Sequence, residues 1–159
     1  MDGLSIRRAE TRDIPALSAL LYQVELIHHR GRPDLFRGPA AKYSRDELAV
    51  LLADETTPIF VCTDKSDVVL GYVFCRFKQH VNDDVMTDVK SLYIDDFCVE
   101  ETCRGRGVGT LLIEHAKHFA RETGCYNLTL NVWAFNESAI AFYEKSGLRP
   151  QKIGMETIL

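Results

Sequence analysis

The sequence has no long apolar run, no excess of basic residues and no metal-ligand motif. Its 19 Lys and Arg stand against 23 Asp and Glu, which gives a net charge of −4 at pH 7. This charge argues against nonspecific nucleic-acid binding, which draws on a basic surface. No run approaches the roughly 18 apolar residues of a membrane span, and residues 1–5 lack the basic segment of an export signal. We therefore predict no membrane association and no resident metal.

Paired cysteines are also lacking. The five cysteines are odd in number, scattered and without a C-x-x-C pair: Cys62, Cys75, Cys98, Cys103 and Cys125. Disulfide frameworks and cysteine-based zinc sites show closely patterned pairs. The pattern therefore favours reduced thiols and a cytoplasmic setting.

The chain does have enough apolar sequence for a substantial core. With 46% hydrophobic and 26% charged residues, positions 1–159 are expected to form one domain. The apolar periodicity and turn residues predict strands at 4–8, 58–63, 68–79, 92–99, 126–132 and 149–159, helices at 13–29, 44–53, 108–120 and 136–146, and a polar loop at 80–90. The S-x-x-E form that begins at Ser44 is a capping box, which marks the start of the second helix.

The order of these elements predicts an α/β (α+β) fold. Strands 92–99 and 126–132 are joined by a helix, so they should be parallel and connected by a right-handed crossover. Strands 58–63 and 68–79 are separated by a polar turn and should form an antiparallel hairpin. The expected result is a mixed sheet with helices on its faces.

The most informative segment is the run RGRGVG at residues 104–109, which lies between a predicted strand and a predicted helix. A helix N-terminus leaves backbone N–H groups unpaired and carries roughly half a positive charge, so an anion is stabilised there. Gly105, Gly107 and Gly109 allow the positive φ angles and the close approach that a concave nest of N–H groups requires. Arg104 and Arg106 add positive charge. The segment therefore predicts a pyrophosphate pocket.

The spacing of this run excludes two common phosphate-binding loops. A Walker loop needs a Gly-Lys-Ser/Thr sequence after its first glycine, and no such lysine follows. The dinucleotide fingerprint is G-x-G-x-x-G, whereas this run is G-x-G-x-G. The pattern of Arg104, Gly107 and Gly109 instead resembles the acetyl-coenzyme A (acetyl-CoA) pyrophosphate loop of the GNAT N-acetyltransferase superfamily.

A second segment strengthens this resemblance. Residues 136–148 are similar to the closing motif of the same superfamily, an Asn, an Ala, Phe-Tyr and Gly. They predict a short helix with Asn136 as its N-cap and Gly147 just past its end. Asn136, Ile140 and Tyr143 share one helical face and can address one cleft. Phe142 points about 100° away, toward a core.

The resemblance implies the GNAT fold, a mixed sheet of about six to seven strands with helices on both faces and one parallel strand pair splayed around coenzyme A. It implies acetyl-CoA as the acetyl donor, and we also expect a homodimer. Cofactor contacts are implied for the strand before the glycine turn, for the turn and for the segments that follow: Phe97, Cys98, Val99, Arg104, Gly105, Arg106, Gly107, Val108, Gly109, Thr110, Asn131, Asn136 and Tyr143.

The implied reaction moves an acetyl group from a thioester to an amine. A lysine-like amine with a pKa of about 10.4 is neutral at pH 7 in about one molecule in 2,500, a handicap of roughly 4.6 kcal/mol, so a base must remove a proton. A phenol with a pKa of about 10 can protonate the departing thiolate, and Tyr143 occupies the position of that acid in relatives. A backbone N–H near Cys98 or Val99 is the expected oxyanion donor.

The candidate bases are Asp95, Asp96 and Glu100. Strand alternation places Asp95 and Asp96 on opposite faces. Members resembling this sequence, including polyamine acetyltransferases, often have an acidic pair here whose first acid faces the acceptor amine, so we favour Asp95, acting directly or through water. The alternative is that one acid is a solvated strand residue and the other caps a turn.

The acceptor is left open between small amines, amino acids, antibiotics, polyamines and protein N-termini. In the family the acceptor wall follows the first helix, where this chain has His28, His29, Arg30, Arg32, Asp34 and Phe36. A merely solvated surface is the alternative for this cluster. Cys98 has no histidine at a recognisable spacing, so direct transfer is favoured over a ping-pong reaction. The alternative function is a noncatalytic acetyl-CoA sensor or interaction module.

Overall fold

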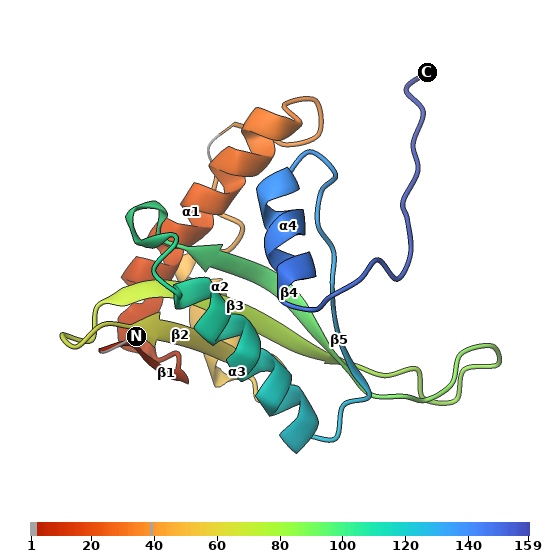
Figure 1. Ribbon diagram of the computed structural model, residues 1–159, viewed down its shortest axis with the longest axis horizontal. Coiled ribbons are helices and arrows are strands. Elements are labelled where there is room, and N and C mark those ends of the chain that lie inside the picture. The colour runs from red at the N-terminus through yellow and green to blue at the C-terminus, as the bar shows by residue number, and fades with distance from the viewer. Residues whose placement is uncertain (1–2, 39) are drawn as a thin grey trace.

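A single mixed sheet forms the centre of the fold (Figure 1). The computed structural model describes residues 3–38 and 40–159. Within these residues five strands lie in the order β1-β2-β3-β4-β5. Neighbours pair antiparallel from β1 to β4, and β4 pairs parallel with β5. The strands are β1 (Ser5–Arg8), β2 (Ile59–Thr63), β3 (Val69–Lys78), β4 (Ser91–Val99) and β5 (Asn127–Leu130).

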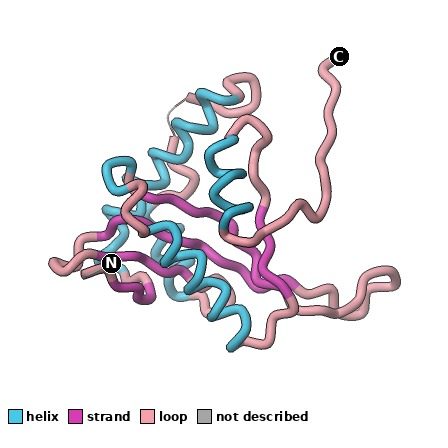
Figure 2. Tube along the Cα trace, in the orientation of Figure 1, coloured by secondary structure: helices cyan, strands magenta, loops and turns pink. Residues whose placement is uncertain are grey.

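Helices cover both faces of this sheet (Figure 2). One face carries α1 (Ile14–Gly31) and α2 (Arg45–Ala53), and the other carries α3 (Val108–Glu122) and α4 (Glu137–Lys145). Two short 3-10 turns, η1 (Thr11–Asp13) and η2 (Glu101–Cys103), precede α1 and α3. The predicted α/β class, the hairpin and the parallel crossover pair are therefore confirmed.

Each face of the sheet has its own apolar core. Alternation along the strands divides the side chains, because successive residues of a strand point to opposite faces. Val61 and Tyr72 pack with α1, whereas Phe60 and Val73 pack with α3. Leu112 of α3 is fully buried against the second pair. The two cores hold α1 and α3 at set positions on either side of β4.

Capping residues determine where two of the helices begin and end. The Ser44 hydroxyl accepts a hydrogen bond from the Glu47 amide at 3.2 Å, and the Glu47 carboxylate accepts one from the Ser44 amide at 2.7 Å, which completes the predicted capping box before α2. Asn136 caps α4 by accepting from the Ala139 amide at 3.2 Å. Gly147, with φ of +86°, follows the end of α4 as predicted.

The predicted number of strands, about six to seven, is wrong for the described residues, which form five. Residues 149–159, expected to be a last strand, form no strand and extend away from the body (Figure 1). The alternation of Ile153 and Met155 fits a strand, but alternation does not supply the neighbouring strand that pairing needs. Glu156 of this tail forms an ion pair with Arg32 at the end of α1.

The parallel pair separates partway along β4. Its register ends where Ile94 lies opposite Leu130, and β4 then continues to Val99 without β5. The edge of β4 that faces away from β3 is therefore free of a strand from residue 95 onward. The predicted splayed pair is confirmed.

A β-bulge coincides with this separation. Between β3 and β4, Phe74 lies opposite Asp96 and Cys75 lies opposite Ile94, so Asp95 is an extra residue in β4. The extra residue reverses the alternation, because Ile94 packs in the core beside α3 and Asp96 lies two residues later on the side of Tyr72 and α1. The bulge thus changes which face each acid of β4 uses.

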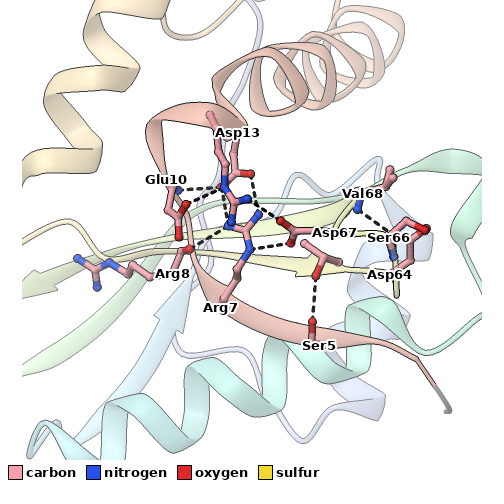
Figure 3. A network of polar contacts seen from close by, with 11 residues as sticks. Ser5, Arg7, Arg8, Glu10, Asp13, Asp64, Ser66, Asp67 and Val68 are labelled. Carbon is pink, nitrogen blue, oxygen red and sulfur yellow. Dashed lines mark hydrogen bonds and ion pairs between the residues drawn. The ribbon is translucent and has the colours of Figure 1, made fainter.

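A buried ion pair fastens the start of α1 to β1 (Figure 3). Arg7 donates to both carboxylate oxygens of Asp13 at 2.7 and 2.8 Å and to Asp67 at 2.9 Å. Burial alone would raise the pKa of Asp13, but the hydrogen bonds from Arg7 and from the Glu10 amide outweigh burial and hold that pKa below its usual value.

The Arg7–Asp13 pair predicts a specific dependence of stability on pH. Because the folded-state pKa of Asp13 is lowered, its contribution to the free energy of unfolding is present above the unfolded pKa of about 3.9 and is lost as the pH falls through the folded value. We expect Arg7→Met to lower the free energy of unfolding at pH 7 by about 2–3 kcal/mol, because the buried carboxylate loses its partner. Denaturant unfolding from pH 7 to pH 2 measures both effects.

The matched control for this prediction is Arg12→Met. Arg12 pairs with Glu10 and Asp67 on an exposed surface, so its loss should change the free energy of unfolding by about 1 kcal/mol or less. A wild-type stability that does not fall between pH 5 and pH 2, or an Arg7→Met variant with the same acid profile as wild type, would contradict the role given to this pair.

Candidate active site

The glycine-rich segment forms a left-handed turn at the start of α3. Gly105 and Gly107 have φ angles of +75° and +89°, a region that residues with a Cβ rarely adopt. Gly107 is the N-cap of α3, and no side chain caps its first turn. Val108 is buried beneath the turn, whereas Thr110 is exposed. The first N–H groups of α3 are thus left without a side-chain acceptor, as an anion site requires.

Gly109 also has a packing role. A Cβ built at this position would lie 3.2 Å from the ring of Phe142 and 3.5 Å from a methyl group of Val99. The absence of a side chain therefore lets α3 pack closely against the side chains of Phe142 in α4 and Val99 in β4. Close approach of backbones is one of the standard reasons for glycine in such turns.

The two arginines of the turn are not engaged by carboxylates of the described chain. Arg106 donates to the sulfur of Cys103 at 3.7 Å, and Arg104 follows η2 in an extended conformation. Their positive charge remains available at the start of α3, where it adds to the field of the helix N-terminus.

Gln23 of α1 joins the end of β4 to this turn, and sequence reasoning missed it. Its amide nitrogen donates to the Val99 carbonyl at 3.0 Å and to the Cys98 sulfur at 3.2 Å, while its oxygen accepts from the Glu101 amide at 3.2 Å. The partners lie more than 70 residues away in the chain. A polar residue on an amphipathic helix carries no signal of such a distant contact.

The free half of β4 and the side chains of α4 face each other across the splay. The ring of Phe97 lies 5.6 Å from the ring of Phe142 and 6.0 Å from that of Tyr143. Cys98 points to the opposite face, and burial raises the pKa of its thiol to about 12. A thiol with this pKa stays protonated near neutral pH, so it is poorly suited to act as a nucleophile.

Tyr143 lies at the wall of this splayed region. Burial raises the pKa of its hydroxyl well above the usual value, and the nearby charge of Asp96 acts in the same direction. A phenol with a raised pKa remains protonated at neutral pH. The hydroxyl can therefore donate a proton or a hydrogen bond from this position.

The two predicted asparagine contacts already have partners within the chain. The Asn136 oxygen caps α4, and the Asn131 amide donates to the Tyr93 hydroxyl at 3.2 Å, just past the end of β5. An Asn amide offers two donors and a carbonyl oxygen with two lone pairs, so further contacts to a ligand are compatible with these bonds. Both residues border the segment where β5 leaves β4.

Asp95 and Asp96 converge on one cation, which corrects the expectation that they occupy opposite faces. The ammonium of Lys42 lies 3.1 Å from a carboxylate oxygen of each acid. The physical reason is the bulge, because an extra residue breaks the strict alternation on which the expectation rested. Tyr43 donates to Asp95 at 2.8 Å, and Tyr72 donates to Asp96 at 2.9 Å.

Opposing effects act on the pKa of Asp95. Burial would raise its pKa, but the hydrogen bond from Tyr43 and the charges of Lys42 and Arg76 outweigh burial and lower the pKa. Asp95 is therefore ionised at neutral pH while its partners remain in place. Glu100, the third candidate base, lies in the turn after β4, where its amide donates to the Leu70 carbonyl at 2.8 Å.

The last turn of α1 and the segment after it meet the β5–α4 connection in an aromatic cluster. The rings of His28 and Phe36 lie 4.9 Å apart, and Phe36 meets Trp133 edge to face at 5.3 Å. Trp133 stacks with Phe135 at 6.2 Å. Arg32, by contrast, pairs with Asp34 and Glu156 on the surface. The residues of the predicted acceptor wall thus fall into two groups: His28 and Phe36 contact the β5–α4 connection, and Arg32 and Asp34 form an ion pair on the surface.

Comparison with known proteins agrees with this geometry. The Acetyltransferase (GNAT) family matches residues 24–148. A mutant of the BH1408 protein from Bacillus halodurans has a crystal structure with a TM-score of 0.93 at 30% identity, over 98% of this chain and 99% of that chain. Glucosamine-6-phosphate N-acetyltransferase from Arabidopsis thaliana has the same fold, with a TM-score of 0.71 at 18% identity over 99% of each chain. The chain therefore belongs to the GNAT acetyltransferase family.

Similarity to curated sequences is more local. The chain is 36% identical to the uncharacterized N-acetyltransferase YdgE of Bacillus subtilis (strain 168) over 66 residues, which are 42% of each protein. It is 29% identical to the peptidyl-lysine N-acetyltransferase YjaB of Escherichia coli (strain K12) over 92 residues, 58% of this chain and 50% of that protein. The chain spans about half the length of the curated relatives it matches.

The described residues also lack the features of a membrane span and of a metal centre. None of the helices within residues 3–38 and 40–159 has the length and apolar character needed to cross a bilayer. In the same part of the chain, no three His, Cys, Asp or Glu side chains gather in a way that could hold a metal ion.

The backbone of the glycine turn gives a direct test by substitution. We expect Gly107→Ala to lower the free energy of unfolding by about 1–2 kcal/mol, because φ of +89° places a Cβ against the following carbonyl. Denaturant unfolding of the variant measures the loss. Gly38→Ala is the control, since Gly38 has open space around its Cα and should tolerate the change. Equal stability of both variants would contradict the left-handed turn at Gly107.

Proposed function

We propose that the protein is an N-acetyltransferase that moves an acetyl group from acetyl-CoA to an amine by direct attack on the thioester. The observation that carries this proposal is the position of three features around one splay: the uncapped start of α3, the free edge of β4 and the Tyr143 hydroxyl. Membership of the GNAT family supports the same conclusion. We take residues 1–159 as one acetyltransferase domain.

The donor is held along the free edge of β4 and at the start of α3 in this proposal. The N–H groups of residues 104–110 bind the diphosphate, helped by the charges of Arg104 and Arg106. The left-handed turns at Gly105 and Gly107 support this fit, because they turn consecutive N–H groups toward one concavity. The backbone of Phe97, Cys98 and Val99 binds the pantetheine arm, and Asn131 and Asn136 border it.

Proton transfer is assigned to Asp95 and Tyr143. The acceptor gives a proton to Asp95, directly or through water, and its nitrogen then attacks the thioester carbon. A C–N bond forms, the C–S bond breaks, and the departing sulfur takes the proton of the Tyr143 hydroxyl. The second proton of the attacking nitrogen then restores that hydroxyl, directly or through water, and Asp95 releases its proton to solvent. A backbone N–H near Cys98 or Val99 stabilises the oxyanion between these steps. Asp96 and Glu100 are the alternatives to Asp95 as base.

Substitution of the acid and the base tests this assignment. We expect Asp95→Asn and Tyr143→Phe each to lower kcat about 10²–10⁴-fold, because each removes a group that moves a proton in the transition state. Release of free thiol from acetyl-CoA across a panel of amines measures the rate. Asp84→Asn, in the exposed 80–90 loop, is the control and should match wild type. An Asp95→Asn variant with an unchanged rate and pH profile would move the base to Asp96 or Glu100.

A noncatalytic acetyl-CoA sensor is the second candidate function. It shares the donor site and differs only in having no acceptor chemistry. The hydroxyl of Tyr143 and the acids of β4 favour catalysis, because a pure binding site has no need of a proton donor and acceptor beside the thioester. Saturable binding of acetyl-CoA with no thiol release on any amine would favour the sensor.

The acceptor and the setting of the reaction are also proposals. A small-molecule or peptide amine fits the acids beside the splay. A cytoplasmic setting is supported by the cysteines, which are all free thiols.

We further propose that the protein forms a homodimer in which the C-terminal tails are exchanged. Ile153, Met155 and Ile158 of the tail have exposed fractions of 78%, 89% and 80%, which is unusual for apolar side chains. The sheet ends at β5, so one edge of β5 has no neighbouring strand. A second copy supplies both the cover for the tail and the missing neighbour, because the exchange is reciprocal.

Removal of residues 149–159 tests the exchange. We expect the full chain to sediment as a dimer of about twice its 18.0 kDa and the shortened chain as a monomer, because the proposed interface is lost. Analytical ultracentrifugation over a range of concentrations measures both. A full chain that stays monomeric would contradict the proposed exchange, and so would a dimer that is unaffected by the deletion.

A further inference from the structure

A lysine from the α1–α2 connection occupies the acid pair of β4. The Lys42 ammonium lies 3.1 Å from the Asp95 carbonyl oxygen, 3.1 Å from a carboxylate oxygen of Asp95 and 3.1 Å from one of Asp96. An ammonium has three N–H donors and no acceptor. The three oxygens therefore match the full donor set of one primary ammonium.

The surrounding groups hold the two carboxylates in place independently of Lys42. The Tyr72 hydroxyl donates to Asp96 at 2.9 Å from within the core, and the Tyr43 hydroxyl donates to Asp95 at 2.8 Å. These bonds leave one oxygen of Asp96 directed at the ammonium. The arrangement is a preformed receptor for a cation, because the oxygens are oriented by groups that stay when the cation leaves.

The charges of the carboxylate cluster, which consists of Asp95, Asp96, Arg76 and Lys42, balance only while a cation is bound. Asp95 and Asp96 carry two negative charges, and Arg76, whose Nε lies 3.7 Å from Asp95, supplies one positive charge. Lys42 supplies the other. Loss of Lys42 leaves one uncompensated charge in a partly buried site, which strongly favours uptake of another cation.

The carboxylate cluster borders the position assigned to the thioester. Asp95 is the bulge residue directly after Ile94, where β4 leaves β5. The charge of Asp96 is close enough to Tyr143 to contribute to the raised pKa of its hydroxyl. Phe97, the next residue of β4, contacts the Tyr143 ring. The cation site and the proton donor therefore contact neighbouring residues of β4 at the splay, on its two faces.

We propose that Lys42 is an internal occupant of the acceptor subsite, and that the acceptor is a primary alkylammonium that displaces the Lys42 ammonium from Asp95 and Asp96. This inference rests on the proposed acetyl transfer only in calling the displacing amine the acceptor. The cation site itself does not depend on acetyl transfer. Lys42 lies in an irregular connection, and its side chain is partly exposed, so it can leave without unfolding a helix or strand.

Displacement of Lys42 by the acceptor exchanges two ions of the same kind. One primary ammonium replaces another, so the charge and the number of N–H donors at the site stay the same. A tethered lysine competes at an effective concentration of about 1 mM or more. We therefore expect its removal to increase the affinity of primary alkylammonium ions at least tenfold. A merely structural ion pair would not compete with the acceptor, so its removal would leave the KM for primary amines unchanged or raised.

The experiment uses Lys42→Met in the full chain, with butylammonium as the probe and tetramethylammonium as its comparison at equal ionic strength. We expect the variant to unfold at a lower temperature than wild type, and butylammonium to restore its melting temperature. The butylammonium concentration for half of this restoration should be at least tenfold below the concentration needed for any effect on wild type. Tetramethylammonium has no N–H group and should not restore it. Lys65→Met, in the exposed β2–β3 turn, is the control and should show no response to butylammonium.

Two outcomes would overturn the proposal: equal responses to butylammonium and tetramethylammonium, or no response of the variant to either ion. Lys42→Gln, which keeps a neutral donor, takes the place of Lys42→Met where the latter does not fold. Kinetics supply a second readout, with a KM for primary amines at least tenfold lower in the variant. The rescue needs no acetyl-CoA, so failure of acetyl transfer and failure of this proposal are separate results.

Discussion

The separation of β4 from β5 after Ile94 is the constraint on which the rest of the site depends. Strand pairing satisfies backbone N–H and C=O groups, and where pairing stops those groups must find other partners. The free edge of β4 offers such groups between the start of α3 and the face of α4. The bulge at Asp95 occurs at the same place and directs both acids of β4 toward one cation. The same stretch of β4 thus carries both the edge that we propose binds the donor and the acid pair.

The fold itself follows closely from the sequence. Apolar periodicity indicates the hairpin, the parallel crossover and the helices, because amphipathic elements must bury one face. The capping box at Ser44 and the glycine after α4 mark helix ends through local hydrogen bonds and φ angles. The turn at residues 104–109 is equally local. Its glycines and arginines predict an anion site without reference to any long-range contact.

The features that could not be predicted all depend on contacts between distant residues. The bulge arises from the register of β3 against β4, and one extra residue brings Asp95 and Asp96, expected on opposite faces, to one cation. Gln23 and Lys42 bind partners 53 or more residues away, so no local pattern marks them. Residues 149–159 have strand-like alternation, but whether they pair depends on a neighbour that the alternation does not identify.

The central claim is that backbone amides at the start of α3 bind the diphosphate of coenzyme A. Isothermal titration calorimetry of the purified full chain with coenzyme A tests it most directly, since binding is measured without any acceptor amine. The account predicts saturable heat with one site per chain and weaker binding at higher salt, because a charged diphosphate meets two arginines and a helix N-terminus. No heat with either coenzyme A or acetyl-CoA would contradict it.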